Sequence, residues 1–162
     1  MDKNYLIAEE IVFNAKPDAV PFNYRTSYKI GQLCLILSIC CGRKGCSYFK
    51  LHMIAMSLCT KQEMLSLKNF TDNVFNSYTL VRFDPAVNRA VKYAIADGVM
   101  LQQVNGLFKL TTKGKSFADA IKKESDLMVS EKYFLNDLSN KLTEDKIKNL
   151  MSIWRYSDAP NK

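Results

Sequence analysis

The sequence has few residues that break regular structure, with 6 Gly and 4 Pro in 162 residues. With 48% hydrophobic and 24% charged residues, this scarcity excludes collagen-like, low-complexity and largely disordered chains. Long apolar runs are also missing, because the longest has nine residues and a membrane span needs about 20. The N-terminus places acids within its apolar stretch and has no small-residue cleavage pattern, which argues against a secretory signal. We therefore expect a cytoplasmic protein with no membrane partner.

Metal-ligand patterns are missing as well. The sequence has one histidine and no C-x-x-C pair, and Cys41, Cys46 and His52 are the nearest approach to a ligand set. The cysteines are odd in number and lie in or beside apolar segments, so we expect reduced thiols that act as small buried hydrophobes. We predict no metal and no cofactor. The five cysteines are Cys34, Cys40, Cys41, Cys46 and Cys59.

The chain also lacks a recognisable catalytic constellation. No nucleophile accompanied by a base, no carboxylate pair and no phosphate-binding loop can be identified. The loop from Gly42 to Gly45 is basic, but it lacks the spacing that wraps a polyphosphate. The lone His52, beside Leu51 in a helical pattern, is typical of a structural residue. We predict no catalytic residues and no enzyme activity.

Amphipathic helices dominate what is present. The apolar spacing predicts a buried helix over residues 27–41 and a second over 47–59 with Leu51, Ile54, Ala55 and Leu58 inward. Thr60 and Glu63 have the spacing of a capping box, which predicts a third helix over 61–70. Residues 1–27 form the expected N-terminal arm, and residues 71–81 have no clear assignment. Two further helices are expected after residue 124, with Ser130 and Thr143 as their caps.

The strongest local signals lie between residues 84 and 124. Asp84 as N-cap, Pro85 at the first position and Gly98 as a stop predict a helix over 85–97. Asn105-Gly106 between two apolar runs predicts a β-hairpin with a type I′ turn. Another helix should start after Thr111 or Thr112. The residues expected to face inward are Val87, Ala90, Val91, Ala94 and Ile95 in the first helix and Phe117, Ala118 and Ile121 in the second.

Helix, hairpin and helix in this order favour a mainly α fold with a small β-hairpin. We expect a winged helix-turn-helix domain over residues 28–124 and a C-terminal helical extension over 125–162. The final residues should form a frayed end.

The net charge of +7 is concentrated in one part of the chain. Between Arg82 and Lys123 there are eight basic and three acidic residues, a net charge of +5. In a winged helix, the helix before the hairpin usually enters the DNA groove, and nearby cations meet phosphates. Each cation taken alone is equally well explained as a solvated surface residue. The predicted DNA-binding residues are Asn88, Arg89, Lys92, Lys109, Lys113 and Lys115.

Five segments taken together resemble a known family. They are TSYKIGQLCLIL (26–37), KLHMIAMSL (50–58), RFDPAVNRAV (82–91), ADGVM (96–100) and LTTKG (110–114). As an ordered set they resemble the middle component of bacterial ABC-three-component systems, which include the small subunit of Lamassu-type anti-phage and anti-plasmid defence. The resemblance implies a winged-helix subunit that joins an SMC-like ABC ATPase and an effector nuclease, with double-stranded DNA reached through the complex. It carries over no catalytic residues.

A partner surface would require exposed apolar side chains. The candidates are Tyr133, Phe134 and Trp154, with Tyr48 and Phe49 as further possibilities, and core filling is an equally good interpretation of each. The alternative function is a free-standing winged-helix transcription regulator, which would dimerise through its terminal helices and read a palindrome.

Overall fold

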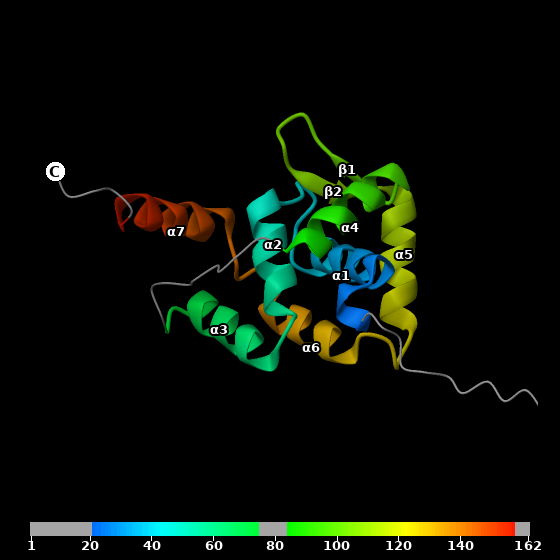
Figure 1. Cartoon of the computed structure of the whole chain (residues 1–162), viewed down its shortest axis with the longest axis horizontal. Coiled ribbons are helices and arrows are strands. Elements are labelled where there is room, and N and C mark those ends of the chain that lie inside the picture. Colours follow the sequence, from blue (N-terminus) through cyan, green and yellow to red (C-terminus); the bar gives the residue numbers. More distant parts are fainter. Residues whose placement is uncertain (1–20, 75–83, 158–162) are drawn as a thin grey trace, which may run out of the picture.

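The computed structural model describes residues 21–74 and 84–157, so the expectations for residues 1–20, 75–81 and 158–162 lie outside the described residues. The described chain is mainly helical and has a small antiparallel hairpin (Figure 1), as predicted. In chain order the elements are η1 (Phe22–Tyr24), α1 (Thr26–Ile39), α2 (Tyr48–Ser57), α3 (Lys61–Thr71), α4 (Pro85–Ala96), β1 (Met100–Gln102), β2 (Phe108–Leu110), α5 (Thr112–Lys123), α6 (Val129–Leu138) and α7 (Glu144–Ser157).

Helix α1 is the centre of the fold. Helices α2, α4, α5 and α6 all pack against it, and strand β2 covers its C-terminal part (Figure 1). Leu33, Leu35 and Ile36 are completely buried. A helix that is apolar on nearly all sides has to be enclosed by other elements, and this explains its central place.

Side-chain caps set most of the helix starts, including the predicted starts after Thr60 and Thr143. The Ser47 hydroxyl accepts a hydrogen bond from the Lys50 amide at 3.1 Å, and Thr60 accepts one from the Glu63 amide at 3.1 Å. The Thr143 hydroxyl accepts from the Lys146 amide at 3.2 Å. Each cap satisfies an amide that the helix itself leaves without a partner.

The hairpin is confirmed, but the predicted turn type is wrong. Of the two turn residues only Gly106 has a positive φ, of 80°, whereas a type I′ turn needs two. The Gly106 amide donates to the Gln103 carbonyl at 2.9 Å, and the Gln103 amide donates to the Leu107 carbonyl at 2.8 Å. This pattern is typical of a three-residue loop with a glycine bulge. Asn105 instead accepts a hydrogen bond from the Leu107 amide through its side chain.

A residue from the loop between α1 and α2 extends the sheet. Cys46 forms an isolated antiparallel bridge with Phe108 on β2. The Cys46 amide donates to the Phe108 carbonyl at 3.0 Å, and the Phe108 amide donates back at 2.8 Å. The end of the basic loop after α1 therefore joins the hairpin to the helical core.

Two residues expected to face inward are exposed. In α4, Val87, Ala90 and Ala94 are buried as predicted, but Ile95 is 38% exposed. In α5, Phe117 is 42% exposed, while Ala118 and Ile121 are buried. The reason in α5 is the close approach of Gly114 to the carbonyl of Val99, which turns the side of Gly114, Ala118 and Ile121 toward the core.

The start of α6 also differs from its prediction. Ser130 was expected to cap this helix, but α6 begins at Val129, and Met128 occupies the cap position with a φ of 51°. The side chain of Met128 is buried against Gly31 of α1. Gly31 leaves the space that this methionine fills, and no side chain caps the start of α6.

The helices after residue 124 share the core of α1. Leu135, Leu138 and Leu142 are buried in the same cluster as α1, and the Cys40 thiol donates to the Leu135 carbonyl at 3.5 Å. Ile147 and Leu150 of α7 are buried in it as well. The described part of the C-terminal extension therefore packs on residues of the predicted winged-helix domain.

Candidate nucleic-acid interface

Helix α4 is anchored at its first turn by a buried charge. The Asp84 carboxylate accepts a hydrogen bond from the Ala86 amide at 2.8 Å and caps the helix. Its second oxygen lies 3.8 Å from the Nζ atom of Lys29 on α1, whose side chain is 2% exposed. A charge this deeply buried needs an opposite charge nearby, so the pair fixes the start of α4 against α1.

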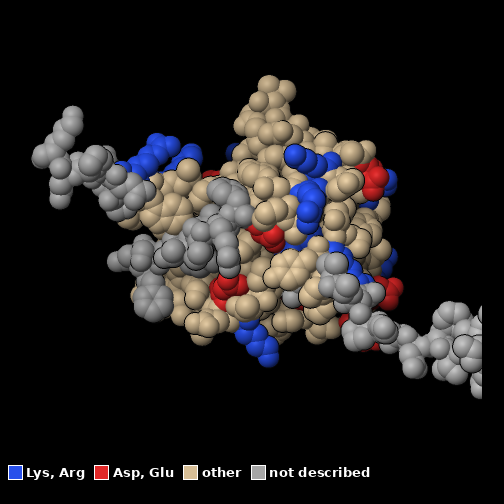
Figure 2. All heavy atoms as spheres, in the orientation of Figure 1, with Lys and Arg blue, Asp and Glu red and all other residues tan. Residues whose placement is uncertain are grey.

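The outer side of α4 carries two cations. Arg89 and Lys92 are both exposed, and their spacing of three residues places them on one side of the helix, beside the exposed ring of Tyr93. Neither side chain is paired with any residue within 21–74 or 84–157. Figure 2 shows Lys and Arg side chains gathered over the position of α4. The predicted exposure of these two residues is confirmed.

Asn88 does not share this outer side, which corrects the prediction. It is half-buried, and its Oδ1 atom accepts a hydrogen bond from the Tyr48 hydroxyl. The Tyr48 ring contacts His52, with ring centroids 4.6 Å apart. Burial lowers the pKa of His52, while a hydrogen bond with Asn88 and the Asp84 carboxylate oppose this effect. Asn88 therefore belongs to a polar contact between α2 and α4.

Lys113 is exposed but has a partner inside the chain. Its Nζ atom donates to the carbonyl of Asp97 at 2.7 Å, directly after the last residue of α4. A cation at the C-terminal end of a helix interacts favourably with the helix dipole. Lys113 therefore links α5 to α4, a role that the sequence-based assignment as a phosphate contact did not foresee.

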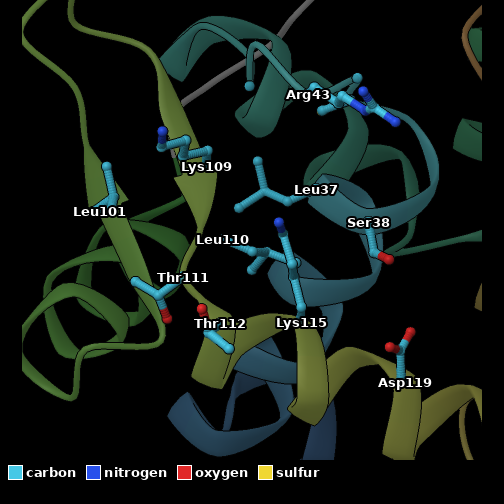
Figure 3. Close-up of a pocket in the computed structure, with 13 residues that line it drawn as sticks. Leu37, Ser38, Arg43, Leu101, Lys109, Leu110, Thr111, Thr112, Lys115 and Asp119 are labelled. Atoms are coloured by element: carbon cyan, nitrogen blue, oxygen red, sulfur yellow. The ribbon is translucent and has the colours of Figure 1, made fainter.

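Lys109 and Lys115 line a separate cavity, together with a residue that the sequence analysis did not select. The cavity has a volume of about 840 Å³ and lies between the end of α1, the loop after it, the hairpin and the start of α5 (Figure 3). Arg43 is its third cation, and no residue of α4 lines it. We call it the basic groove. Its lining residues are Leu37, Ser38, Cys41, Gly42, Arg43, Gly45, Leu101, Lys109, Leu110, Thr111, Thr112, Lys115 and Asp119.

Two glycines set the shape of the basic groove. Gly45 has a φ of 82°, and a Cβ atom there would lie 2.2 Å from the Phe108 carbonyl oxygen. A Cβ atom on Gly114 would lie 2.0 Å from the Val99 carbonyl oxygen. Only glycine fits at either position, because the backbones are in contact. The loop with Arg43 and the start of α5 with Lys115 are thereby held against the hairpin.

The cysteines are free, and all except the half-buried Cys59 are buried, largely as predicted. Burial raises the pKa of Cys34 to about 12 and that of Cys40 to about 12. A hydrogen bond with Cys46 lowers the pKa of Cys41. The thiols of Cys34 and Cys40 are therefore uncharged at neutral pH, which fits a packing role.

The three predicted interface residues have different environments. Tyr133 on α6 is 81% exposed. Phe134 is buried in the core, so its expected exposure is wrong, because α6 turns this residue toward α1. Trp154 is half-buried, and its ring centroid lies 5.9 Å from that of Phe49. Of the three, Tyr133 alone is largely available to a partner.

None of the helices within residues 21–74 and 84–157 is long and apolar enough to cross a membrane. The same residues contain no group of three His, Cys, Asp or Glu side chains placed to hold a metal ion. Comparison with protein-family models, with curated proteins and with solved structures finds no match to this chain.

Proposed function

We propose that this chain is a non-catalytic subunit of a complex with an SMC-like ABC ATPase. It would bridge or regulate this ATPase and an effector nuclease of an anti-phage or anti-plasmid system, and contact double-stranded DNA through phosphates. The proposal takes α1, α2, α4 and the hairpin as a winged helix-turn-helix, with α4 as the helix that faces DNA. The observation that carries it is the exposed, unpaired pair Arg89 and Lys92 beside the hairpin.

The composition of this surface favours phosphates over base edges as the DNA contacts. Sequence-specific proteins read bases with several Arg, Asn or Gln side chains from one helix. Asn88 is engaged with Tyr48, so Arg89 and Lys92 are the two predicted α4 contacts that remain free. Two cations give weak binding that decreases with salt and carries little sequence information.

A second surface supports the role as a subunit. Leu65 on α3 is 57% exposed and Tyr133 on α6 is 81% exposed. They lie one helical turn from Lys68 and Asp137, which join the two helices by an ion pair of 2.5 Å. We infer that these two exposed apolar side chains on neighbouring helices belong to a protein interface. We call Leu65 and Tyr133 the α3–α6 face.

Purification of the tagged chain from its own cells tests the proposal. We expect an SMC-like ATPase to copurify, as identified by mass spectrometry, and the double substitution Leu65→Asp and Tyr133→Asp to remove it. Val104→Asp is the matched control, because Val104 is a fully exposed apolar residue at the hairpin tip. A stable homodimer that binds one operator tightly, with no ATPase copurifying, would contradict the proposal and favour a transcription regulator.

A further inference from the structure

The basic groove combines an apolar floor with a charged rim. Leu37 and Leu110 are 5% and 8% exposed and form the floor. The cations of the rim come from three different elements: Arg43 from the loop after α1, Lys109 from β2, and Lys115 from α5. No aromatic side chain is among the lining residues.

The three cations are unpaired and do not converge on one point. None of the three side chains has a hydrogen bond or ion pair with another described residue. In Figure 3 the ammonium group of Lys115 stands near Leu37 and Leu110, Lys109 lies on the hairpin side, and Arg43 lies on the opposite side. A single phosphate would need converging donors. Cations that are spread around a floor suit an extended ligand with several negative charges.

The edge of β2 beside the groove has one residue without a backbone partner. The Leu107 carbonyl and the Thr111 amide form hydrogen bonds across the hairpin. Because backbone groups of successive residues in an antiparallel strand point in opposite directions, the amides and carbonyls of Phe108 and Leu110 point to the other edge of β2. Phe108 uses this edge to pair with Cys46. The N–H and C=O groups of Leu110 have no backbone partner in the described chain. An extended peptide can bind such groups by adding a short strand.

We propose that the basic groove binds an extended acidic segment of a partner protein. The segment adds its main chain to the edge at Leu110 and places carboxylates at Arg43, Lys109 and Lys115. One of its apolar side chains rests on the leucine floor. The inference deepens the proposed function, because it rests on the chain being a subunit and names the chemistry of one partner contact.

The lining of the groove favours a peptide over a nucleic acid. Single-stranded nucleic acids are usually held by aromatic side chains that stack on the bases, and this groove has none. A DNA backbone would also gain nothing from the leucine floor.

Titration of the full-length ¹⁵N-labelled chain with a synthetic peptide tests the inference by NMR. The probe is the acetylated peptide Asp-Val-Glu-Leu-Asp-Val-Glu, and its control has every acid replaced by the matching amide. We expect the acidic peptide to shift the backbone amides of Arg43, Leu110, Thr111 and Lys115, and the amide control to leave them in place. Because only one short segment binds, the titration extends to millimolar peptide.

Charge removal identifies the residues responsible. The triple variant R43A/K109A/K115A should bind the acidic peptide at least about tenfold more weakly. The matched control K61A/K123A/K148A removes three exposed lysines outside the groove and should stay within about twofold of the natural chain. An equal loss in both variants would mean nonspecific attraction and would overturn the inference.

Two other results would also overturn it. One is the absence of groove shifts at millimolar acidic peptide. The other is a duplex DNA of 20 base pairs that shifts the same amides and displaces the peptide, which would make the groove a nucleic-acid site. Either result leaves the copurification test of the proposed function unaffected. Conversely, peptide binding in the groove without a copurifying ATPase would contradict the proposed function alone.

Discussion

Two regions of the molecule carry unpaired cations, and their surroundings differ. On α4, Arg89 and Lys92 project from a convex helix into solvent. In the basic groove, Lys109, Lys115 and Arg43 surround buried leucines and an open strand edge. Solvated cations on a convex surface attract phosphates from outside, whereas cations around an apolar floor also favour a ligand with apolar groups.

This difference shows why the net charge alone does not define a binding surface. Lys29 and Lys50 count toward the +7, but both are buried. Lys29 lies beside Asp84, and Lys50 donates to the Cys40 carbonyl at 3.0 Å at the end of α1. These lysines stabilise the fold. Only cations that reach the surface and lack a partner are available for binding, and five of them lie on α4 and around the basic groove.

The largest expected effect comes from breaking the anchor of α4. Asp84→Ala leaves Lys29 buried without its partner, which should lower the free energy of unfolding by about 3–5 kcal/mol, as measured by urea denaturation. Asp84→Asn keeps a good cap and removes only the charge, so it separates the ion pair from the cap. A loss in Asp84→Ala of no more than about 1 kcal/mol, the value of a cap alone, would mean that the ion pair does not anchor α4.

Substitution of Gly45 should disrupt the contact between the loop after α1 and β2. Gly45→Ala places a Cβ atom against the Phe108 carbonyl at a positive φ, so we expect a loss of about 1–3 kcal/mol in unfolding free energy. The paired substitution Gly42→Ala meets no atom within 4 Å and should cost about 1 kcal/mol or less. Urea denaturation of both variants provides the comparison. Equal stabilities would show that the loop does not need its contact with β2.

Charge reversal on α4 should separate the two surfaces in function. Arg89→Glu with Lys92→Glu should weaken binding to duplex DNA by about tenfold or more. The decrease of DNA affinity with salt concentration should become less steep, by the amount expected for the loss of about two phosphate contacts. Binding of the acidic peptide should not change, because neither residue lines the groove. Fluorescence anisotropy across a salt series measures both ligands. DNA affinity that stays the same at every salt concentration would remove α4 from the site.

The smallest effect is expected at Lys113, which lies between the two regions. Lys113→Met removes the bond to the Asp97 carbonyl and should lower the free energy of unfolding by about 0.3–1 kcal/mol. DNA affinity should fall by no more than about twofold if Lys113 is structural. A loss of DNA binding as large as that of the α4 variant would return Lys113 to the predicted DNA contacts.

The sequence predicted the elements well where the signals are local. Asp84 with Pro85, and Thr60 with Glu63, start helices through bonds that span at most three residues, so they can be recognised without the fold. The hairpin follows from Gly106 for the same reason. The turn type could not be predicted from these two residues, because the Asn105 side chain accepts a hydrogen bond from the Leu107 amide and Asn105 keeps a negative φ.

The candidate site was predicted less well, because it depends on contacts between distant segments. Arg43 lines the same groove as Lys109 only because Cys46 pairs with Phe108, and nothing in the local sequence of the loop indicates that bridge. Asn88 turns inward because Tyr48 supplies a donor from another helix. The spacing of charges on one helix gives no information about either contact.

One NMR experiment tests most directly whether the two basic surfaces serve different partners. The labelled chain is first saturated with the acidic peptide, and duplex DNA is then added. We predict that DNA shifts the amides around Arg89 and Lys92 while the peptide-induced shifts of Leu110 and Lys115 persist. DNA that displaces the peptide and shifts the groove amides would show a single polyanion surface and would contradict this account.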